Sequence, residues 1–247
     1  GKIAVITGGN GGIGKGIARG FAAVGANIVI AARNEPKTKE AEREIKNDFD
    51  VQVLGLKVDV LQEDQIAAMV SKAVESFGTI DILVNNAGIG IHKLPQDMSN
   101  EEWDRNININ LRSTFVCSNA VYPVMKKGGG GKIINMGSMF AIFGAGALPA
   151  YAASKGGIVQ LTKSLAIAWA QDNIRVNALM PGFINTGLSA EGKRDIPGLE
   201  EMVVGRTPLG RWGEAEDCAG AAVFLASAAS DFVTGAAVPV DGGFSVM

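Results

Sequence analysis

The segment Ile3-Ala4-Val5-Ile6-Thr7-Gly8-Gly9-Asn10-Gly11-Gly12-Ile13-Gly14 decides the fold, because an apolar run passes directly into a glycine-rich turn and then into a helical pattern. A strand, a tight glycine loop and a helix in this order are typical of the start of a dinucleotide-binding βαβ unit. Small residues let the backbone approach a pyrophosphate, and the free N–H groups of a helix N-terminus attract its charge. The segment therefore predicts a nucleotide site, with a purely structural tight turn as the alternative; the predicted site residues are Gly8, Asn10, Gly12, Ile13 and Gly14.

Short apolar runs alternate with amphipathic helical patterns along the whole chain. Strands are predicted over Ile3–Thr7, Ile28–Ala32, Val51–Val58, Ile82–Asn85, Lys132–Met136, Arg175–Leu179 and Ala237–Val240, and helices over 12–24, 36–47, 62–77, 100–126, 150–171 and 214–227. Such alternation implies right-handed βαβ crossovers. No internal repeat or composition break marks a second domain. We expect one α/β domain over residues 1–247, a Rossmann-type three-layer sandwich with a parallel sheet of about seven strands flanked by helices on both faces.

Composition, net charge and cysteine content indicate which class of protein this is and which partners are not expected. The chain has 247 residues, 47% of them hydrophobic, and 33 glycines, which suits a buried parallel sheet with tight turns. The net charge is −2 with no basic run, so we expect no nucleic-acid partner. No apolar run reaches membrane-spanning length and no signal peptide is visible, so a cytoplasmic protein is expected. Cys117 and Cys218 lie in apolar helical patterns, which predicts buried free thiols rather than a disulfide, and no metal-binding cluster is visible.

Two further segments carry local signals. Ser99-Asn100-Glu101-Glu102 is typical of a capping box that opens the helix near residue 100. Residues 183–210 are interrupted by glycines and prolines among short helical patches. A segment of this kind between strands is often a mobile lid, and we predict a substrate lid here, with an ordinary surface excursion as the alternative.

The end of the second strand bears on the choice of cofactor. An acid at this point would bind the ribose 2′-hydroxyl of NAD. Ala32 stands there instead, followed by Arg33 and Asn34. A guanidinium can pair with a 2′-phosphate, so the sequence favours NADP(H), with NAD(H) possible. The alternative is that Arg33 stacks on adenine or points to solvent.

Tyr151-Ala-Ala-Ser154-Lys155 supplies the chemistry, thirteen residues after Ser138. Positions four apart share one helix face, so the phenol and the ammonium are neighbours. A free tyrosine has a pKa of about 10, and a nearby cation lowers it. Tyr151 is therefore predicted to be an acid–base residue, with a core tyrosine as the alternative. Its hydroxyl would exchange a proton beside the nucleotide.

These motifs together resemble a short-chain dehydrogenase/reductase of the single-domain type over essentially the whole chain. The matching residues are Thr7-Gly8 with Gly12-Ile13-Gly14, Asp59, Asn85-Asn86-Ala87-Gly88, Asn110, Ser138, Tyr151 with Lys155, Asn177, Pro181-Gly182 and Thr186. The stretches Gly130-Gly131-Lys132-Ile133-Ile134-Asn135 and Gly210-Arg211-Trp212-Gly213 resemble the gluconate and deoxygluconate dehydrogenase and carbonyl reductase branch.

The resemblance implies a role for each matching residue. Tyr151 would exchange a proton with the substrate oxygen, Ser138 would bind that oxygen, and Lys155 would hold the nicotinamide ribose. Asn110 would hold a water that links Lys155 to solvent, and the family pattern Asn110-Leu111…Phe115 selects it over Asn108. Further cofactor contacts are implied for Asp59, Val60, Asn86, Ala87, Gly88, Pro181, Gly182, Ile184 and Thr186.

The substrate pocket is expected to be largely apolar. Its predicted residues are His92, Met139, Phe140, Phe143 and Phe183, although His92 could equally be an exposed loop residue. A sugar acid would need a cation for its carboxylate, and the candidates are Lys93, Arg112, Lys193 and Arg194. An apolar wall suits a cyclic ketone at least as well.

Three functional hypotheses remain from the sequence. The first is an NADP-dependent oxidoreductase acting on a secondary alcohol or ketone such as a polyol, sugar acid or cyclic ketone. The second is a β-ketoacyl-carrier-protein reductase, and the third is a non-catalytic nucleotide-binding regulatory protein, against which the intact Ser138, Tyr151 and Lys155 argue. The resemblance also implies a homotetramer assembled through the long helices, including residues 158–170, and the apolar end Ala236–Met247.

Overall fold

The computed structural model describes the backbone of residues 1–247 and the side chains of all of them except residues 188, 191 and 195. Seven parallel strands form one sheet in the order β3-β2-β1-β4-β5-β6-β7. The strands are β1 (Ile3–Thr7), β2 (Asn27–Ala32), β3 (Val53–Lys57), β4 (Ile82–Asn85), β5 (Gly131–Met136), β6 (Ile174–Pro181) and β7 (Ala237–Val240). The predicted α/β class with a parallel sheet is confirmed.

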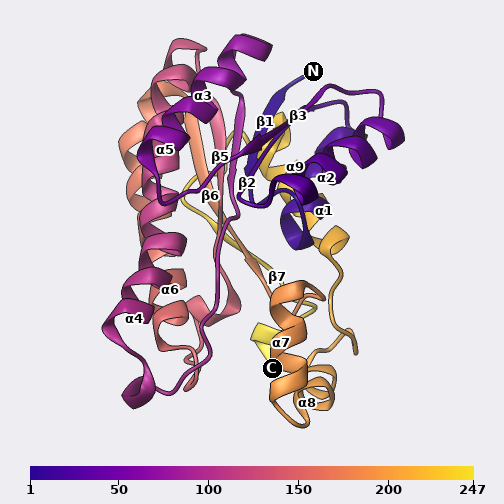
Figure 1. Ribbon diagram of the computed structural model, residues 1–247, viewed down its shortest axis with the longest axis vertical. Helices are drawn as coiled ribbons and strands as arrows, with labels where there is room; N and C mark the ends of the chain where they lie inside the picture. Colours follow the sequence, from indigo (N-terminus) through magenta and orange to yellow (C-terminus); the bar gives the residue numbers. More distant parts are fainter.

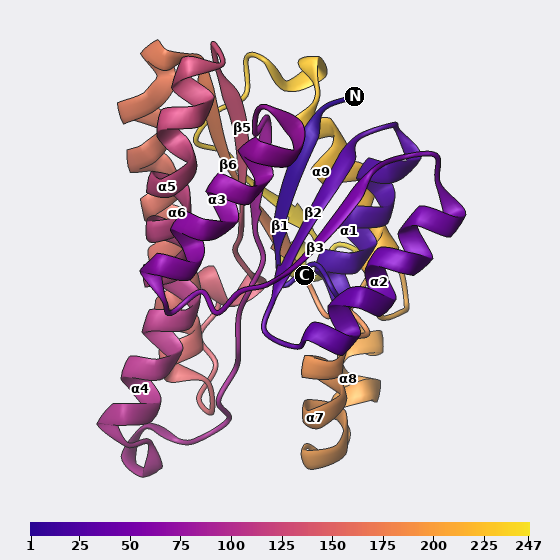
Figure 2. The same ribbon diagram turned by 45° about the horizontal axis from the view of Figure 1, so that its top comes forward.

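Helices cover both faces of the sheet (Figures 1 and 2). One layer holds α1 (Gly12–Ala23), α2 (Glu35–Asp48) and α9 (Ala219–Ala226), and the other holds α3 (Glu63–Phe77), α5 (Ser113–Lys127) and α6 (Pro149–Trp169). The central strands are buried on both sides, so their side chains alternate between the two cores. In β1, Val5 belongs to the core under α3, α5 and α6, whereas Ile6 belongs to the core under α1, α2 and α9.

The strand order reverses between β1 and β4, and this point positions the site. From β1 the chain continues outward to β2 and β3, and β4 then returns to the other side of β1. In open parallel sheets, ligands bind outside the carboxyl ends of the strands at such a reversal. The loops after β1 and β4 therefore lie at the expected place for a nucleotide.

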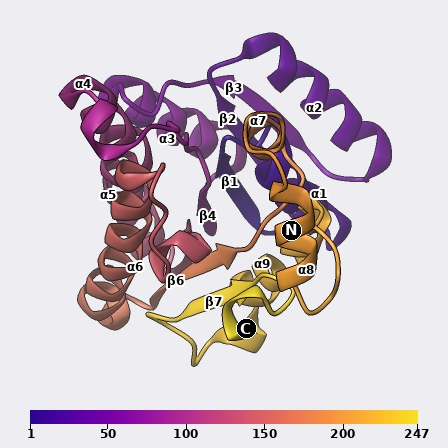
Figure 3. The ribbon, with the colours of Figure 1, turned by 90° about the horizontal axis from the view of Figure 1, so that it is seen from below.

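Additional helices surround this carboxyl edge (Figure 3). Helix α4 (Asn100–Ile107) lies beyond the edge on the side of α5 and α6, whereas α7 (Gly187–Asp195) and α8 (Leu199–Arg206) lie beyond it on the side of α1. The predicted capping box is present, since the Ser99 side chain accepts from the Glu102 amide and the Glu102 side chain accepts from the Ser99 amide.

The predicted helix over 100–126 is wrong in one respect, because it is not continuous. It is α4, a five-residue π-helical turn over Asn108–Arg112 and then α5. The turn coincides with the buried Asn110, whose side-chain amide is hydrogen-bonded to Ile89 in the loop after β4 as well as to Asn106 in α4. Single π-helical turns are common at functional sites, where the extra residue re-aims a side chain.

Helices α7 and α8 were not expected as regular elements within residues 183–210. Thr186 forms a capping box with Ser189 that opens α7, and Gly198, at φ 76°, allows the sharp entry into α8. Short helices between glycine and proline interruptions carry little periodic signal, which explains the omission. The strand ends also differ from expectation by one or two residues in β2, β3, β5 and β6.

The two thiols are buried as predicted. Cys117 packs in the core under α5 and Cys218 in the core on the opposite face of the sheet. Burial raises the pKa of each thiol to about 12, so neither is a reactive thiolate near neutral pH. Across the residues that the structure describes, no helix is long and apolar enough to cross a membrane.

Candidate active site

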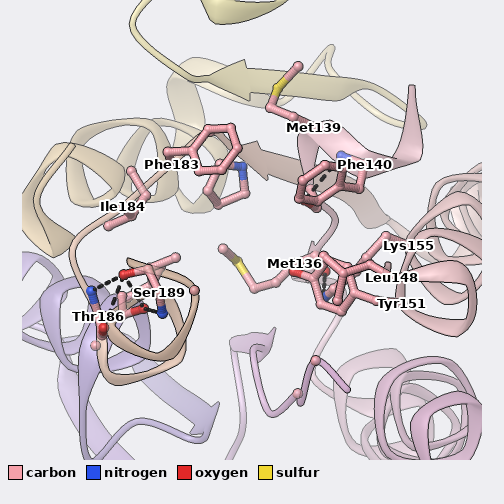
Figure 4. A pocket seen from close by; sticks show the side chains of 18 of the residues that line it. Met136, Met139, Phe140, Leu148, Tyr151, Lys155, Phe183, Ile184, Thr186 and Ser189 are labelled. Atoms are coloured by element: carbon pink, nitrogen blue, oxygen red, sulfur yellow. Dashed lines mark hydrogen bonds between the residues drawn. The ribbon is translucent and has the colours of Figure 1, made fainter. Parts of the chain in front are cut away.

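A cavity of about 740 Å³ opens at the carboxyl edge of the sheet. Most of the predicted site residues line it: Gly8, Asn10, Gly12, Ile13, Asn86, Ala87, Gly88, His92, Ser138, Met139, Phe140, Phe143, Tyr151, Lys155, Pro181, Gly182, Phe183, Ile184 and Thr186. Figure 4 shows Tyr151 and Lys155 on one side of the cavity and Ile184, Thr186 and Ser189 across from them. Segments far apart in sequence thus meet around one space.

The glycine loop between β1 and α1 fits a phosphate-bearing cofactor. Helix α1 begins at Gly12 after Gly11, and no side chain caps its first turn. Gly11, Gly12 and Ile13 line the cavity, where an anion would serve as a cap for the free backbone N–H groups of this turn. A side chain at Gly14 could not be accommodated, because its Cβ would overlap the Gly8 carbonyl and the Asn86 amide. Gly14 therefore lies beneath the loop and does not line the cavity.

Hydrogen bonds hold this loop against the end of β4. Asn86 Nδ2 donates to the carbonyl oxygens of Thr7 (3.0 Å) and Gly8 (3.1 Å). The Thr7 hydroxyl accepts from the amides of Asn86 and Ala87, each at 3.0 Å. The two loops at the reversal point are thereby fixed relative to each other before any ligand binds.

Several predicted adenosine contacts do not line the cavity. Arg33 and Asn34 are exposed, and Asn34 caps α2 by accepting from the Lys37 amide at 3.0 Å. Asp59 Oδ1 accepts from the Leu61 amide at 3.0 Å, and Val60 is buried. Lys37, which the sequence analysis did not select, does line the cavity. Its Nζ lies 2.6 Å from the position that a Cβ on Gly11 would occupy.

Tyr151, Lys155 and Ser138 converge on the cavity, as the sequence predicts. Tyr151 and Lys155 lie one turn apart on α6, and Lys155 Nζ is 5.4 Å from the centroid of the Tyr151 ring. The same Nζ donates to the Met136 carbonyl oxygen at 2.7 Å. Ser138 follows β5 and is hydrogen-bonded to Tyr151. The Tyr151 phenol, the Ser138 hydroxyl and the Lys155 ammonium therefore lie close together at one side of the cavity.

Burial controls the ionisation of this group. Desolvation lowers the pKa of Lys155 to about 8, because the charged form loses its hydration. Desolvation also raises the pKa of Tyr151, and the hydrogen bond with Ser138 acts in the opposite direction. The prediction from the sequence that the Tyr151 pKa is lowered is therefore wrong. The physical reason is that Lys155 donates to the Met136 carbonyl oxygen rather than to the phenol. The Tyr151 phenol accordingly stays protonated at neutral pH.

Asn110 is fully buried and belongs to the support of the site rather than to its wall. Its Oδ1 accepts from the Ile89 amide at 2.9 Å. Its Nδ2 lies within 3.0 Å of three acceptors, the Ile89 carbonyl, Asn106 Oδ1 and Ser154 Oγ. Asn110 thereby connects the loop after β4 to α6 at the turn that carries Tyr151 and Lys155.

One side of the cavity has an aromatic wall. Phe140 makes edge contacts with Tyr151 and Phe183, at ring-centroid distances of 6.2 Å and 5.9 Å. Phe183 continues to Trp212 at 5.3 Å and to Phe244 at 5.1 Å. The predicted pocket residues His92, Met139, Phe140, Phe143 and Phe183 all line the cavity, with His92 exposed at its mouth.

The four cations proposed from the sequence for a substrate carboxylate are not among the described residues that line the cavity. Lys93 pairs with Glu102 at 2.6 Å, Arg112 pairs with Glu63, and Lys193 lies 3.4 Å from Glu200. Arg194 likewise has a partner. Residues that the sequence analysis missed line the cavity from other elements: Met136, Leu148, Ser189, Ile196, Leu199, Met202, Arg206, Trp212 and Phe244.

Comparisons with known proteins agree with this geometry. A family model described as enoyl-(acyl carrier protein) reductase matches residues 8–245. The chain is 42% identical over 246 residues to a 2-dehydro-3-deoxy-D-gluconate 5-dehydrogenase of Dickeya dadantii, covering 99% of this chain and 95% of that one. It is 41% identical to a 3-oxoacyl-acyl-carrier-protein reductase of Chlamydia muridarum, and the match covers 99% of this chain and 97% of that one. The crystal structure of a gluconate 5-dehydrogenase from Burkholderia cenocepacia J2315 in complex with NADP and tartrate matches with a TM-score of 0.93 at 38% identity, covering 100% and 96%.

A parallel sheet with a glycine loop at its reversal point and a Ser–Tyr–Lys group beside it defines a nicotinamide-dependent oxidoreductase. The chain belongs to the short-chain dehydrogenase/reductase family and acts on CH–OH groups. Within the described part of the chain, no group of three or more His, Cys, Asp or Glu side chains is placed to hold a metal ion.

Proposed function

We propose that this protein transfers a hydride between NADP(H) and a sugar acid of the gluconate or deoxygluconate type, at the carbon that carries a secondary alcohol or ketone. The observation that carries the proposal is the convergence of Ser138, Tyr151 and Lys155 on a cavity that begins at the glycine loop. Two of the relatives named above, the 2-dehydro-3-deoxy-D-gluconate 5-dehydrogenase and the gluconate 5-dehydrogenase, act on sugar acids by their names, which supports the sugar-acid assignment.

The proposed chemistry divides among three side chains. Tyr151 would protonate the substrate oxygen during reduction and accept that proton during oxidation. Ser138 would hydrogen-bond the same oxygen and hold it within reach of Tyr151. Lys155, with a pKa lowered to about 8, would bind the nicotinamide ribose and return a proton to Tyr151. Asn110 would support this relay by fixing α6 and the loop after β4.

The cofactor would occupy the other half of the cavity. The uncapped first turn of α1 would bind its pyrophosphate, while Asn86 to Gly88 and Pro181 to Thr186 would enclose the rest. When bound, the cofactor supplies the hydride, and the protein orients it. We propose NADP(H), because Lys37 adds a positive charge beside the glycine loop and no acid stands at Ala32. NADP in the related structure supports this choice.

The preference for NADPH over NADH tests whether Lys37 and Arg33 contact the 2′-phosphate. Lys37→Met and Arg33→Met are each expected to lower kcat/KM with NADPH on the order of tenfold and with NADH much less, since one charge-assisted contact to the 2′-phosphate is lost. Initial rates with each cofactor measure this. Lys39→Met is the matched control, because Lys39 pairs with Glu42 at 2.9 Å on the same helix and does not line the cavity. Equal losses with NADPH and NADH would refute the phosphate assignment.

We further propose that residues 183–210 act as a substrate lid. The segment holds α7 and α8 and contributes a large part of the cavity wall, from Phe183 to Arg206.

Assembly into a homotetramer is also proposed. Phe115 on α5, Ile167 on α6 and Val246 near the chain end are 46%, 79% and 82% exposed, which supports burial of these faces between subunits. Light scattering that reports only a monomer would exclude the tetramer.

A second candidate function is reduction of a β-ketoacyl group on an acyl carrier protein, which the Chlamydia muridarum relative supports. The two functions differ in the substrate that the cavity must accept. A sugar acid needs polar and cationic partners, whereas a ketoacyl chain needs an apolar channel and a docking surface for its carrier protein.

A substrate panel tests the proposal. Initial rates would be followed by nicotinamide absorbance with gluconate, a 2-dehydro-3-deoxygluconate, a cyclic ketone and a β-ketoacyl thioester. The highest kcat/KM is expected for one of the two sugar acids. A clear preference for the thioester would establish the second candidate instead, and turnover of the cyclic ketone alone would reject both.

A further inference from the structure

Arg206 is the feature of the cavity that the proposed function leaves unexplained. Basic side chains line the cavity at four positions, Lys37, His92, Lys155 and Arg206. Lys37 lies beside Gly11 at the glycine loop, and the Lys155 ammonium is hydrogen-bonded to the Met136 carbonyl oxygen. His92 is exposed at the mouth of the cavity. Among the described residues that line the cavity, Arg206 is the one arginine, and it lies on the aromatic side, against Phe143 and Phe244.

The surroundings of Arg206 hold its guanidinium in place through two aromatic rings and one hydrogen bond. Arg206 is the last residue of α8 and is half-buried. Its guanidinium carbon lies 4.3 Å from the centroid of the Phe244 ring and 5.0 Å from that of Phe143. One terminal nitrogen donates to the main-chain oxygen of Met247 at 3.1 Å. Within the described part of the chain, no acidic side chain pairs with it.

This arrangement differs from that of the cations considered from the sequence. Lys93, Arg112 and Lys193 each have a carboxylate partner, and none lines the cavity. A guanidinium that stacks on aromatic faces keeps its N–H edge available for a planar acceptor. A carboxylate matches that edge with two parallel hydrogen bonds, which strengthen where water is partly excluded. Arg206 thus has a position fixed by Phe143, Phe244 and Met247, and it has no Asp or Glu partner among the described residues.

Aromatic contacts connect Arg206 to the catalytic group. The Phe143 and Phe244 rings that hold its guanidinium also line the cavity, and Phe244 contacts Phe183 at 5.1 Å. Phe183 contacts Phe140, which in turn contacts Tyr151. A substrate lying along this wall would meet a proton donor near one end and a guanidinium near the other.

We infer that Arg206 binds the carboxylate of the substrate and so makes the enzyme select hydroxy and keto acids over neutral polyols. The inference rests on the proposed function, because it takes the same cavity as the place where substrate is held. It also gives α8 a role, since the anchor for the acid is carried by the proposed lid. Binding of an acid would then hold α8 against the rest of the cavity.

Binding measured without turnover tests the inference. Gluconate and glucitol share a carbon skeleton, but glucitol has no carboxylate. Both can be titrated calorimetrically into the enzyme loaded with NADPH, where neither alcohol can be oxidised. Arg206→Gln is expected to raise the Kd for gluconate by about 10- to 100-fold and to leave that for glucitol unchanged, since charge-assisted contacts to the carboxylate are lost. Arg206→Lys, which keeps the charge but loses the fork, should fall between.

Controls separate recognition from a structural role. Arg112→Gln makes the same chemical change outside the cavity and should alter neither Kd. Thermal unfolding of each variant shows whether the contact with Met247 is needed for folding. Equal weakening of gluconate and glucitol by Arg206→Gln, no weakening, or a wild-type enzyme that binds gluconate no more tightly than glucitol would each overturn the inference. A wild-type enzyme that binds gluconate through Arg206 but oxidises no sugar acid would contradict only the proposed function.

Discussion

Tyr151→Phe is expected to lower kcat/KM by about 10²- to 10⁴-fold, the usual contribution of a positioned general acid. The substitution removes the hydroxyl that we propose exchanges a proton with the substrate oxygen, and it keeps the ring that contacts Phe140. The Kd for NADPH should be nearly unchanged, because the glycine loop and Lys155 remain. Initial rates and cofactor titration on the same preparation measure both quantities.

Tyr122→Phe provides the matched control for this prediction. Tyr122 is the other tyrosine of the chain, and its hydroxyl donates to Asp172 at 2.6 Å, outside the cavity. Its loss should leave kcat/KM close to the wild-type value. If Tyr151→Phe retained most of its activity, the acid would have to be another group. A loss that matched a weakened Kd for NADPH would assign Tyr151 to cofactor binding rather than to proton transfer.

Asn110→Ala is expected to destabilise the protein as well as inactivate it. The substitution leaves the Ile89 amide and carbonyl, Asn106 and Ser154 without their common partner in a fully buried place. Each unsatisfied buried polar group costs about 1–3 kcal/mol, so a loss of about 3 kcal/mol or more is expected, which corresponds to a fall in Tm of roughly 6–12 °C. Thermal unfolding followed by circular dichroism measures the change.

Asn108→Ala separates this role from a general effect of the asparagine-rich turn. Asn108 belongs to the same π-helical turn but is only half-buried. Its replacement should shift Tm by a few degrees at most and leave kcat nearly intact, because surface substitutions away from networks have small effects. Similar losses for Asn108→Ala and Asn110→Ala would mean that the turn itself, rather than the Asn110 amide, supports the site.

The strands could be predicted from the sequence because each is a short apolar run bounded by glycine or polar residues. The limits of β1, β4 and β7 match the prediction, since Ile3–Thr7, Ile82–Asn85 and Ala237–Val240 end where the composition changes. The positions of Ser138, Tyr151 and Lys155 in the cavity were also predictable. They follow or begin elements whose carboxyl-edge placement is fixed by the βαβ pattern.

Other parts of the site were not visible in the sequence for physical reasons. The interruption at Asn110 depends on hydrogen bonds to Ile89 and Ser154, which are distant in sequence. Lys37 reaches the glycine loop because of the direction in which α2 leaves Asn34, and Arg33 does not line the cavity. Arg206 could be placed only once α8 was known to lie against Phe143 and Phe244. Side-chain direction and tertiary contact, rather than spacing, decide each of these.

The most direct test of the central claim is the transfer of deuterium from NADPH labelled at the reactive carbon of its nicotinamide, using each of the two stereoisomers in turn. The wild-type enzyme is incubated with the ketone form of a gluconate-type acid, and the alcohol product is analysed by mass spectrometry. We expect one deuterium on the new carbinol carbon from one isomer only, and almost no product with Tyr151→Phe. An absence of deuterated alcohol from both isomers, with NADPH bound but unconsumed, would contradict the account.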